Sequence, residues 1–367
     1  MRFSLLYFWA LCAILLNIQS SICQGHVWLP GKNVALFVFG DSLFDAGNNI
    51  YINTSSSANY FPYGKSFFKK PTGRISNGRI IPDFIAERVK LPFIPPYLQP
   101  GNRDFSIGVN FACGGSGALD KSFQGLVISL RTQLGYFKNV SQQLRKKLGD
   151  AEAKAFLSRA VYLFSIGNND YIFRLLVTNS SVIRSYSREE FVGQVIGNIS
   201  EVIQDIYKIG GRKFGFLNLV PLDCVPMTRA IEGKNGACFD QFTPFLELHD
   251  KEFSNLLQKQ QSKLKGFKYS ILDFNTFLKE RIDHPSKYGF KESKVACCGS
   301  GPYRAIPSCG GKGGITEYEL CDNVNDYVFF DLVHPTEKVY QQFSKLVWNG
   351  KLSIKGGYNL KALFELK

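Results

Sequence analysis

The stretch Val34-Ala-Leu-Phe-Val-Phe-Gly-Asp-Ser-Leu43 contains six consecutive apolar residues followed by Gly40, Asp41 and Ser42. A short apolar run rich in β-branched and aromatic residues is typical of a strand buried on both faces, as in a parallel sheet. Glycine permits a tight turn at the end of such a strand, which would expose the Ser42 hydroxyl. The stretch therefore predicts a buried parallel strand with a serine at its carboxyl end.

Similar runs recur along the chain and alternate with helical patterns. The expected strands are Val34–Phe39, Ser106–Ala112, Val161–Ile166, Phe214–Val220 and Tyr269–Phe274. The expected helices begin at Ser187, cover about Phe242–Leu264, and follow Pro335. Ser187 and Glu190 form a capping box, and Gly210-Gly211 suits the end of that helix. This alternation predicts an α/β fold with a mostly parallel sheet covered on both faces, and ligands at the carboxyl ends of its strands.

The composition is that of a globular protein. The chain has 367 residues, of which 45% are hydrophobic and 20% charged. No interior stretch reaches the roughly 18 apolar residues that a membrane helix needs, so no stable membrane span is expected. We interpret residues 24–367 as a single domain, because α/β enzymes of this length often form one.

The N-terminus has the pattern of a secretory signal peptide. Arg2 provides the positive start, and an uncharged apolar run spans Leu5–Leu16. We place the cleavage after Cys23, with sites a few residues away equally compatible. An uncleaved anchor is the alternative, but about a dozen apolar residues are too few to span a bilayer. The predicted signal peptide, residues 1–23, implies a secreted, extracellular protein.

Secretion changes the interpretation of the nine cysteines. Disulfides are expected in an oxidising compartment, whereas the absence of a C-x-x-C pair and of suitably spaced histidines argues against zinc. We expect Cys224 to pair with Cys238, and Cys113 to be a buried free thiol. The remaining four should pair among themselves in a connectivity that the sequence leaves open: Cys297, Cys298, Cys309 and Cys321.

Four N-x-S/T sequons fit the same compartment as glycosylation sites: Asn53, Asn139, Asn179 and Asn198. The first three lie in polar surroundings. Asn198 lies near the edge of the apolar face of a predicted helix.

The formal net charge is +14, from 44 basic and 30 acidic residues. A solvated basic surface explains this charge. A more specific hypothesis is electrostatic attraction to cell-wall polyanions or anionic lipid surfaces. A nucleic-acid partner is not expected, because neither the compartment nor a recognisable binding motif supports one.

The four histidines limit the choice of a general base: His26, His249, His284 and His334. His26 directly follows the signal, and His249 lies within a helical pattern where a satisfied or surface histidine is expected. His334 follows Asp331 by three residues, at a turn that we expect to lead from a strand into a helix starting at Pro335. If that turn folds back, the Asp331 carboxylate can accept Nδ1–H and leave Nε2 free as a base.

Two alternatives remain at this point. Asp283-His284 is a rival acid–histidine pair, although adjacent side chains tend to point apart. Ser42 suits a nucleophile at a strand end, but the local sequence alone favours a serine that caps the following helix.

Several blocks in one order resemble a known family. They are Phe39-Gly-Asp-Ser-Leu-Phe-Asp-Ala-Gly-Asn-Asn49, Arg74-Ile-Ser-Asn-Gly-Arg79, Gly108-Val-Asn-Phe-Ala-Cys-Gly-Gly-Ser-Gly117, Gly167-Asn-Asn-Asp170, Ala296-Cys-Cys-Gly299 and Asp331-Leu-Val-His-Pro-Thr-Glu-Lys338. This set is similar to the plant-type GDSL esterase/lipases of the SGNH hydrolase superfamily, over nearly the whole mature chain. The resemblance implies a flavodoxin-like three-layer α/β/α sandwich.

The resemblance also assigns roles. It makes Ser42 the nucleophile, His334 the general base and Asp331 the residue that orients the base, with no metal or cofactor. The oxyanion hole would comprise the Ser42 N–H, the Gly114 N–H (or that of Gly115) and the Asn169 side-chain amide. Cys113 departs from the pattern, since the family often has serine there, and a small thiol should be tolerated.

The implied activity is hydrolysis of a small-molecule or lipid-like acyl ester through an acyl-enzyme. An acyltransferase using the same intermediate is one alternative, and a non-catalytic extracellular binding protein is another. We expect the aromatic-rich segment Tyr60–Phe68 and the stretch Tyr171–Tyr186 to border the substrate pocket.

Overall fold

The computed structural model describes residues 34–102, 104–176, 186–232, 235–314, 317–350, 354–355 and 357–366. The predicted signal peptide, residues 1–23, lies outside the described residues, as do His26 and Asn179. By their internal contacts, Val34–Lys367 form one compact unit.

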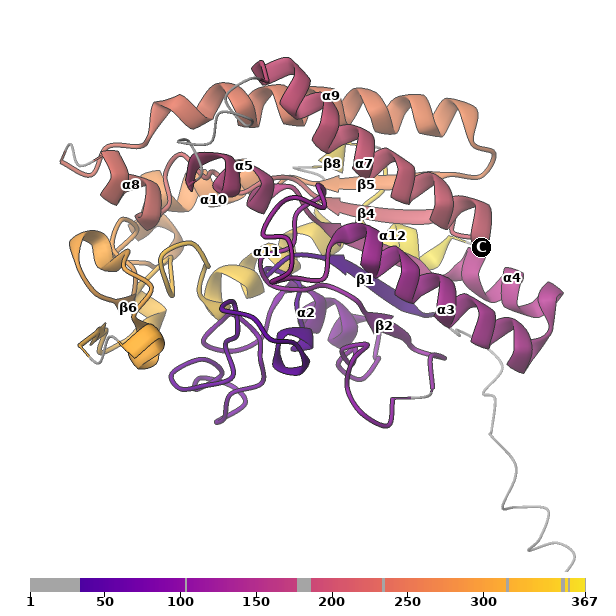
Figure 1. Ribbon diagram of the computed structural model, residues 1–367, viewed down its shortest axis with the longest axis horizontal. Helices are drawn as coiled ribbons and strands as arrows, with labels where there is room; N and C mark the ends of the chain where they lie inside the picture. The colour runs from indigo at the N-terminus through magenta and orange to yellow at the C-terminus, as the bar shows by residue number, and fades with distance from the viewer. Residues whose placement is uncertain are drawn as a thin grey trace, which may run out of the picture. The chain divides into compact units, whose positions relative to one another are not determined.

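A six-stranded sheet with the order β2-β1-β3-β4-β5-β8 lies at the centre of this unit (Figure 1). Five strands are parallel, and β8 (Ile354–Lys355) pairs antiparallel at the edge. The parallel strands are β1 (Leu36–Gly40), β2 (Gly108–Asn110), β3 (Val161–Ser165), β4 (Lys213–Leu217) and β5 (Lys268–Leu272). The order 2-1-3-4-5 is that of flavodoxin-like folds, and it confirms the predicted mostly parallel sheet.

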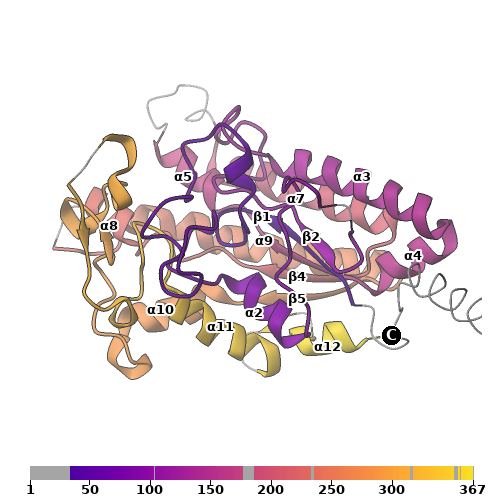
Figure 2. The ribbon, with the colours of Figure 1, turned by 90° about the horizontal axis from the view of Figure 1, so that it is seen from below.

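Helices cover both faces of the sheet, which confirms the three-layer sandwich (Figure 2). One layer contains α3 (Leu130–Leu148), α4 (Asp150–Arg159), α7 (Arg188–Ile209) and α9 (Thr243–Lys263). The other contains α2 (Ile81–Arg88), α10 (Phe274–Asp283), α11 (Glu337–Asn349) and α12 (Leu360–Glu365). The expected capping box starts α7, with the Ser187 side chain accepting from the Glu190 N–H and the Glu190 carboxylate accepting from the Ser187 N–H.

Alternation of side chains along the parallel strands builds an aromatic layer on one face of the sheet. Phe39 lies opposite Phe164, whose neighbour in the next strand is Phe216. Their ring centroids are 4.8 and 5.3 Å apart. Rings in this offset geometry add to the stability that burial provides, about 0.5–1.5 kcal/mol per pair. The layer holds β1 and β3 rigidly at the point where both strands end in polar residues.

The observed strands are shorter than the sequence runs: β1 begins later and continues through Gly40, whereas β2, β3, β4 and β5 end before the expected last residue. The strand that we expected before the turn to His334 is not formed: within the apolar run Val328–Phe330, Phe329 makes an isolated bridge with Pro335. The following helix, α11, begins at Glu337 rather than at Pro335.

Three disulfides stabilise the unit. Cys224 pairs with Cys238 as predicted, Cys297 with Cys321 and Cys298 with Cys309. Among the described residues, Cys113 is the free cysteine, and it is buried. The last two disulfides hold a small sheet of β6 (Cys298–Gly299) and β7 (Glu319–Leu320) beside the carboxyl ends of the central strands (Figure 1).

Candidate active site

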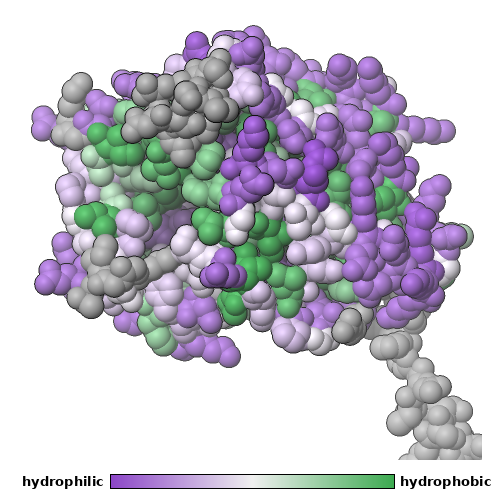
Figure 3. All heavy atoms as spheres, in the orientation of Figure 1, coloured by the Kyte–Doolittle hydropathy of each residue, from purple (hydrophilic) through white to green (hydrophobic). Residues whose placement is uncertain are grey.

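A pocket of about 450 Å³ opens at the carboxyl ends of β1 and β3. This is the point where the strand order reverses, at which ligands bind in open α/β sheets. In Figure 3 apolar side chains gather on the left and in the centre of the view, whereas polar ones dominate on the right, over α3 and α4. Most of the lining is apolar, and it includes Leu43, Ala58, Ile75, Phe123, Ile172, Leu176, Val220, Met227, Ile306, Leu332 and Val333. One set of polar groups in this wall surrounds Ser42, and a second set, Ser55, Ser56 and Ser57, comes from a separate loop.

Ser42 follows β1 through a turn that requires glycine. Gly40 has φ of 135°, and a Cβ there would lie 1.9 Å from the Ser165 carbonyl oxygen. The Asp41 N–H donates to that same oxygen over 2.8 Å, so β1 stays attached to β3 up to the residue before the serine. Ser42 then turns into the pocket, with 9% of its surface exposed.

Asp331 and His334 lie on the segment that precedes α11, and the aspartate organises it. Asp331 Oδ1 accepts the backbone N–H groups of Val333 and His334 at 3.0 and 2.8 Å. This turn carries the imidazole back over the carboxylate, as the three-residue spacing predicted. His334 Nδ1 consequently lies 2.7 Å from Oδ1 and 2.9 Å from Oδ2 of Asp331.

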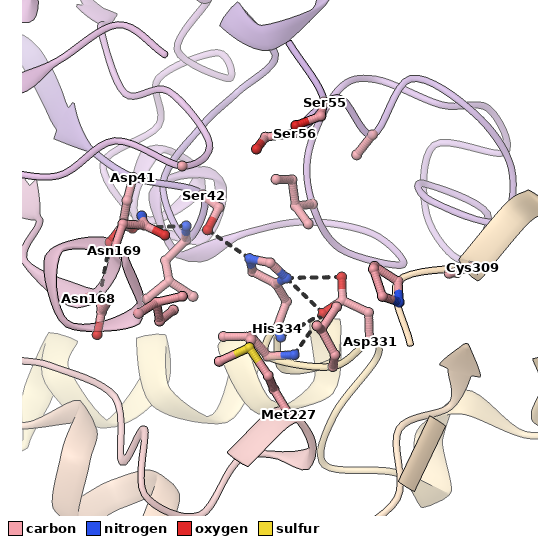
Figure 4. A pocket seen from close by; sticks show the side chains of 18 of the residues that line it. Asp41, Ser42, Ser55, Ser56, Asn168, Asn169, Met227, Cys309, Asp331 and His334 are labelled. Carbon is pink, nitrogen blue, oxygen red and sulfur yellow. Dashed lines mark hydrogen bonds and ion pairs between the residues drawn. The ribbon is translucent and has the colours of Figure 1, made fainter. Parts of the chain in front are cut away.

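The three side chains form one hydrogen-bonded line (Figure 4). His334 Nε2 lies 2.7 Å from Ser42 Oγ, across 292 residues of sequence. Burial raises the pKa of the Asp331 carboxyl, but the His334 charge and its hydrogen bonds outweigh burial, so the net pKa lies below 3.8. An ionised Asp331 acceptor favours the tautomer with the proton on Nδ1, which leaves Nε2 to accept the serine proton.

Asp41 and Asn168 hold the turn that carries Ser42 in place. Asn168, at the start of α5 (Asn168–Leu176), donates from Nδ2 to Asp41 Oδ2 over 3.0 Å. Its Oδ1 accepts the Val220 N–H beyond β4 at 3.0 Å. Burial raises the pKa of the Asp41 carboxyl to about 6, against the hydrogen bonds from Asn168, Leu43 and Ser165. The ends of three strands are therefore joined beneath Ser42.

The two glycines that the sequence left open as oxyanion donors differ in the structure. The Gly114 N–H donates to Asp45 Oδ2 over 3.1 Å, and Gly114 is absent from the described lining of the pocket. Gly115 lines the pocket beside Ser42. The geometry thus favours Gly115 over our first choice, Gly114, because the Gly114 N–H is already engaged.

Asn169 lines the same pocket, and its amide is oriented by the backbone. Its Nδ2 donates to the Ser116 carbonyl oxygen over 2.9 Å. An amide nitrogen carries two hydrogens, so one remains for a ligand. This contact fixes a donor within the pocket without adding charge.

The other described histidines lie apart from this line. His249 is buried on α9, and its Nδ1 lies 2.8 Å from Tyr171 Oη, so it is satisfied internally. His284 is exposed at the end of α10 and does not line the pocket. Cys113 is also internal, since its sulfur accepts the Ile128 N–H at 3.2 Å.

Tyr63 is the residue of this site that the sequence did not single out. Its hydroxyl donates to Asp331 Oδ2 over 2.8 Å, and its side chain is buried. Only its place in the aromatic segment Tyr60–Phe68 pointed toward the pocket. Tyr60 and Tyr63 do line the pocket, as do Ile172 and Leu176 from the start of the stretch Tyr171–Tyr186. Residues 177–185 of that stretch lie outside the described part of the chain.

Three of the predicted glycosylation sites are described. Asn53 and Asn139 are exposed. Asn198 is half-buried on α7, where Nδ2 donates to the Gln194 carbonyl and Oδ1 accepts from Arg131. Over the described ranges, no group of three or more His, Cys, Asp or Glu side chains is placed to hold a metal ion. No helix in that part of the chain is long and apolar enough to cross a membrane.

Comparison with known proteins agrees with this geometry. Residues 36–347 match the family model described as GDSL-like lipase/acylhydrolase. The chain is 54% identical to GDSL esterase/lipase 1 of Arabidopsis thaliana over 359 residues, 96% of each chain. It is 48% identical to a GDSL lipase of Tanacetum cinerariifolium, covering 91% of this chain and 88% of the relative.

Proposed function

The chain belongs to the GDSL-like lipase/acylhydrolase family and is a carboxylic ester hydrolase, and from this premise we propose that Ser42, His334 and Asp331 are its catalytic residues. The observation that supports the assignment is the hydrogen-bonded line from Ser42 Oγ through His334 to Asp331 at the wall of the pocket. The base lies within hydrogen-bond distance of the nucleophile through Nε2 and of the orienting acid through Nδ1, as covalent catalysis requires.

In the proposed mechanism Ser42 Oγ attacks the ester carbonyl while His334 Nε2 takes its proton. The imidazolium that forms is stabilised by the Asp331 carboxylate, and it then protonates the departing alcohol. Water attacks the resulting acyl-enzyme with His334 again as base, which releases the acid and restores Ser42. The carbon–oxygen bond of the ester is cleaved once, and no redox step is involved.

We assign the oxyanion hole to the Ser42 and Gly115 N–H groups and the Asn169 amide. Gly115 replaces Gly114 in this assignment because the Gly114 N–H is bound to Asp45. Donors of this kind are worth about 2.7–4 kcal/mol each in the transition state.

The pocket indicates the substrate class. Its wall is largely apolar, although Ser55, Ser56 and Ser57 line it as well as the polar groups around Ser42. We therefore propose esters with an apolar acyl chain. Each added methylene buried in the pocket contributes about 0.8 kcal/mol, so kcat/KM should rise roughly fourfold per methylene until the pocket is full.

We further propose that the protein is secreted after removal of residues 1–23, and is glycosylated at Asn53, Asn139, Asn179 and Asn198. Three disulfides support an oxidising compartment. The charge of +14 supports association with cell-wall polyanions. Elution from an anionic polysaccharide matrix at the salt concentration typical of a neutral protein would contradict that association.

The test is hydrolysis of p-nitrophenyl esters of graded chain length by the secreted protein. Ser42→Ala and His334→Ala should each lose nearly all activity, whereas His284→Ala, an exposed histidine outside the pocket, should retain it. Full activity in Ser42→Ala would refute the nucleophile. An added alcohol in the assay separates hydrolysis from acyl transfer, because transfer yields a new ester.

A further inference from the structure

Tyr63 makes a hydrogen bond that the Ser42–His334–Asp331 arrangement does not itself require. Its Oη donates to Asp331 Oδ2 at 2.8 Å, so this oxygen is held by Tyr63 on one side and by His334 Nδ1 on the other. The backbone N–H groups of Val333 and His334 bind the other oxygen, Oδ1. Donors to both oxygens fix the rotation of the carboxylate about its Cβ–Cγ bond.

The tyrosine is itself held rigidly. Its ring packs edge-on against Phe330, the residue before Asp331, at a centroid distance of 5.2 Å. A second edge-on contact, at 5.3 Å, joins it to Tyr60, which also shares a side-chain hydrogen bond with it. Cys298 and Cys309 belong to the same small buried cluster. A hydroxyl in such a setting loses little freedom when it binds the carboxylate.

Resting on the function proposed above, we propose that Tyr63 is a positioning residue for catalysis, which acts through Asp331 on the orientation and basicity of His334. The hydroxyl stabilises the Asp331 charge and turns the positive end of its dipole toward the place where the imidazolium forms. Without it the carboxylate would bind the proton on His334 more tightly and in a less defined orientation. His334 would then be a stronger base in the free enzyme, but its Nε2 would be oriented less precisely toward Ser42 Oγ.

Other titratable groups also face the Asp331–His334 pair. Tyr60 contributes from the segment that holds Tyr63, Tyr340 from α11, and Asp41 from the end of β1. Of these groups only Tyr60 contacts the Tyr63 hydroxyl, and Tyr63→Phe removes that one oxygen while it keeps the ring that packs on Phe330. A change in the pH profile of that variant therefore reports on the Tyr63 hydroxyl.

The test compares Tyr63→Phe with wild type on one p-nitrophenyl ester. A hydrogen bond to a charged group is worth enough that kcat should fall roughly threefold to thirtyfold, with KM changed less than twofold. The acid limb of the pH profile of kcat/KM should shift to higher pH, by a few tenths of a pH unit to about one unit. The matched control is Tyr162→Phe, a buried tyrosine whose hydroxyl donates to the Leu157 carbonyl at 2.9 Å. It should leave both kcat and the acid limb in place.

The Asp331→Asn background provides the second arm. There Tyr63→Phe should change kcat less than twofold, because the carboxylate through which it acts is absent. An unmoved acid limb in Tyr63→Phe, or an equal loss of kcat in both backgrounds, would overturn the proposal. Ser42→Ala distinguishes failure of the Tyr63 proposal from failure of the proposed function. If Ser42→Ala is inactive while Tyr63→Phe behaves as wild type, only the role of Tyr63 fails. If Ser42→Ala retains activity, the proposed function itself fails.

Discussion

Asn168 donates a hydrogen bond from Nδ2 to Asp41 Oδ2 over 3.0 Å, and so joins the residue before Ser42 to the residue before Asn169. The proposed nucleophile and one proposed oxyanion donor come from strands β1 and β3, and this bond sets their relative position. Its partners are buried, so water cannot easily replace a lost member.

Exchange of the two side chains tests this relationship. In Asp41→Asn one of the two acceptor oxygens becomes an NH2 donor, so either Asn168 or the Leu43 N–H and Ser165 hydroxyl lose their acceptor, and we expect kcat to fall about 10- to 100-fold. In Asn168→Asp two buried carboxylates would face each other, with a similar or larger loss. The double variant restores one donor and one acceptor, and it should recover much of the lost kcat. Steady-state kinetics of the three variants checks this, and a double variant no better than the worse single would contradict it.

Asn169 offers a test of the oxyanion hole. Asn169→Ala removes the donor, and we expect kcat to fall about 10²- to 10³-fold with little change in KM, because the interaction strengthens only in the transition state. Asn169→Asp keeps the shape but places a negative charge near the developing oxyanion, and should be worse. Equal activities of the two variants would argue against an oxyanion contact. Circular dichroism establishes that both are folded.

The sequence predicts which residues make up this candidate site more completely than it predicts their arrangement in space. Ser42, Asp331 and His334 lie in local motifs, so short-range patterns and the family resemblance identify them. Tyr63 and Asp331 are 268 residues apart, and no local signal relates them. The choice between Gly114 and Gly115 depends on whether a carboxylate 69 residues away takes one N–H, which only the folded chain shows. The carboxyl ends of β2, β3, β4 and β5 were overestimated for a related reason: their apolar runs continue past the end of the strand into the core.

The Cys298–Cys309 disulfide links stability to substrate binding. Both cysteines line the pocket, together with Ile306 and Pro307. Replacing both cysteines with alanine should lower the free energy of unfolding by about 3 kcal/mol and raise KM for long-chain esters more than for acetate esters. Cys297 and Cys321 form the matched control, because this pair flanks the same small sheet but does not line the pocket. Their replacement should lower stability similarly and leave the chain-length profile unchanged. If both double variants altered that profile equally, the effect would not come from the pocket wall.

His249 makes stability depend on pH. Burial lowers the pKa of its imidazole from 6.5 to about 3, whereas the unfolded chain keeps the ordinary value. Between these two values the unfolded state binds more protons than the folded one. The contribution of neutral His249 is therefore fully present above pH 6.5 and is lost progressively as the pH falls toward 3. The shift corresponds to a loss of the order of 5 kcal/mol across that range.

Comparison with His249→Asn isolates this contribution, because asparagine can still place a polar group near Tyr171 Oη but does not titrate. Buried Asp41, Asp45 and Asp170 have pKa values of about 6, and they work in the opposite direction between about pH 4 and 6. Their contribution is common to both proteins and cancels in the difference. We expect wild type to be more stable at pH 7, because its ring fills the site, and its advantage to shrink steadily below pH 6.5. Urea unfolding followed by tryptophan fluorescence at pH 4.5, 5.5, 6.5 and 7.5 measures this difference. An advantage that stays constant over the series would mean that His249 binds its proton equally well in the folded and the unfolded chain.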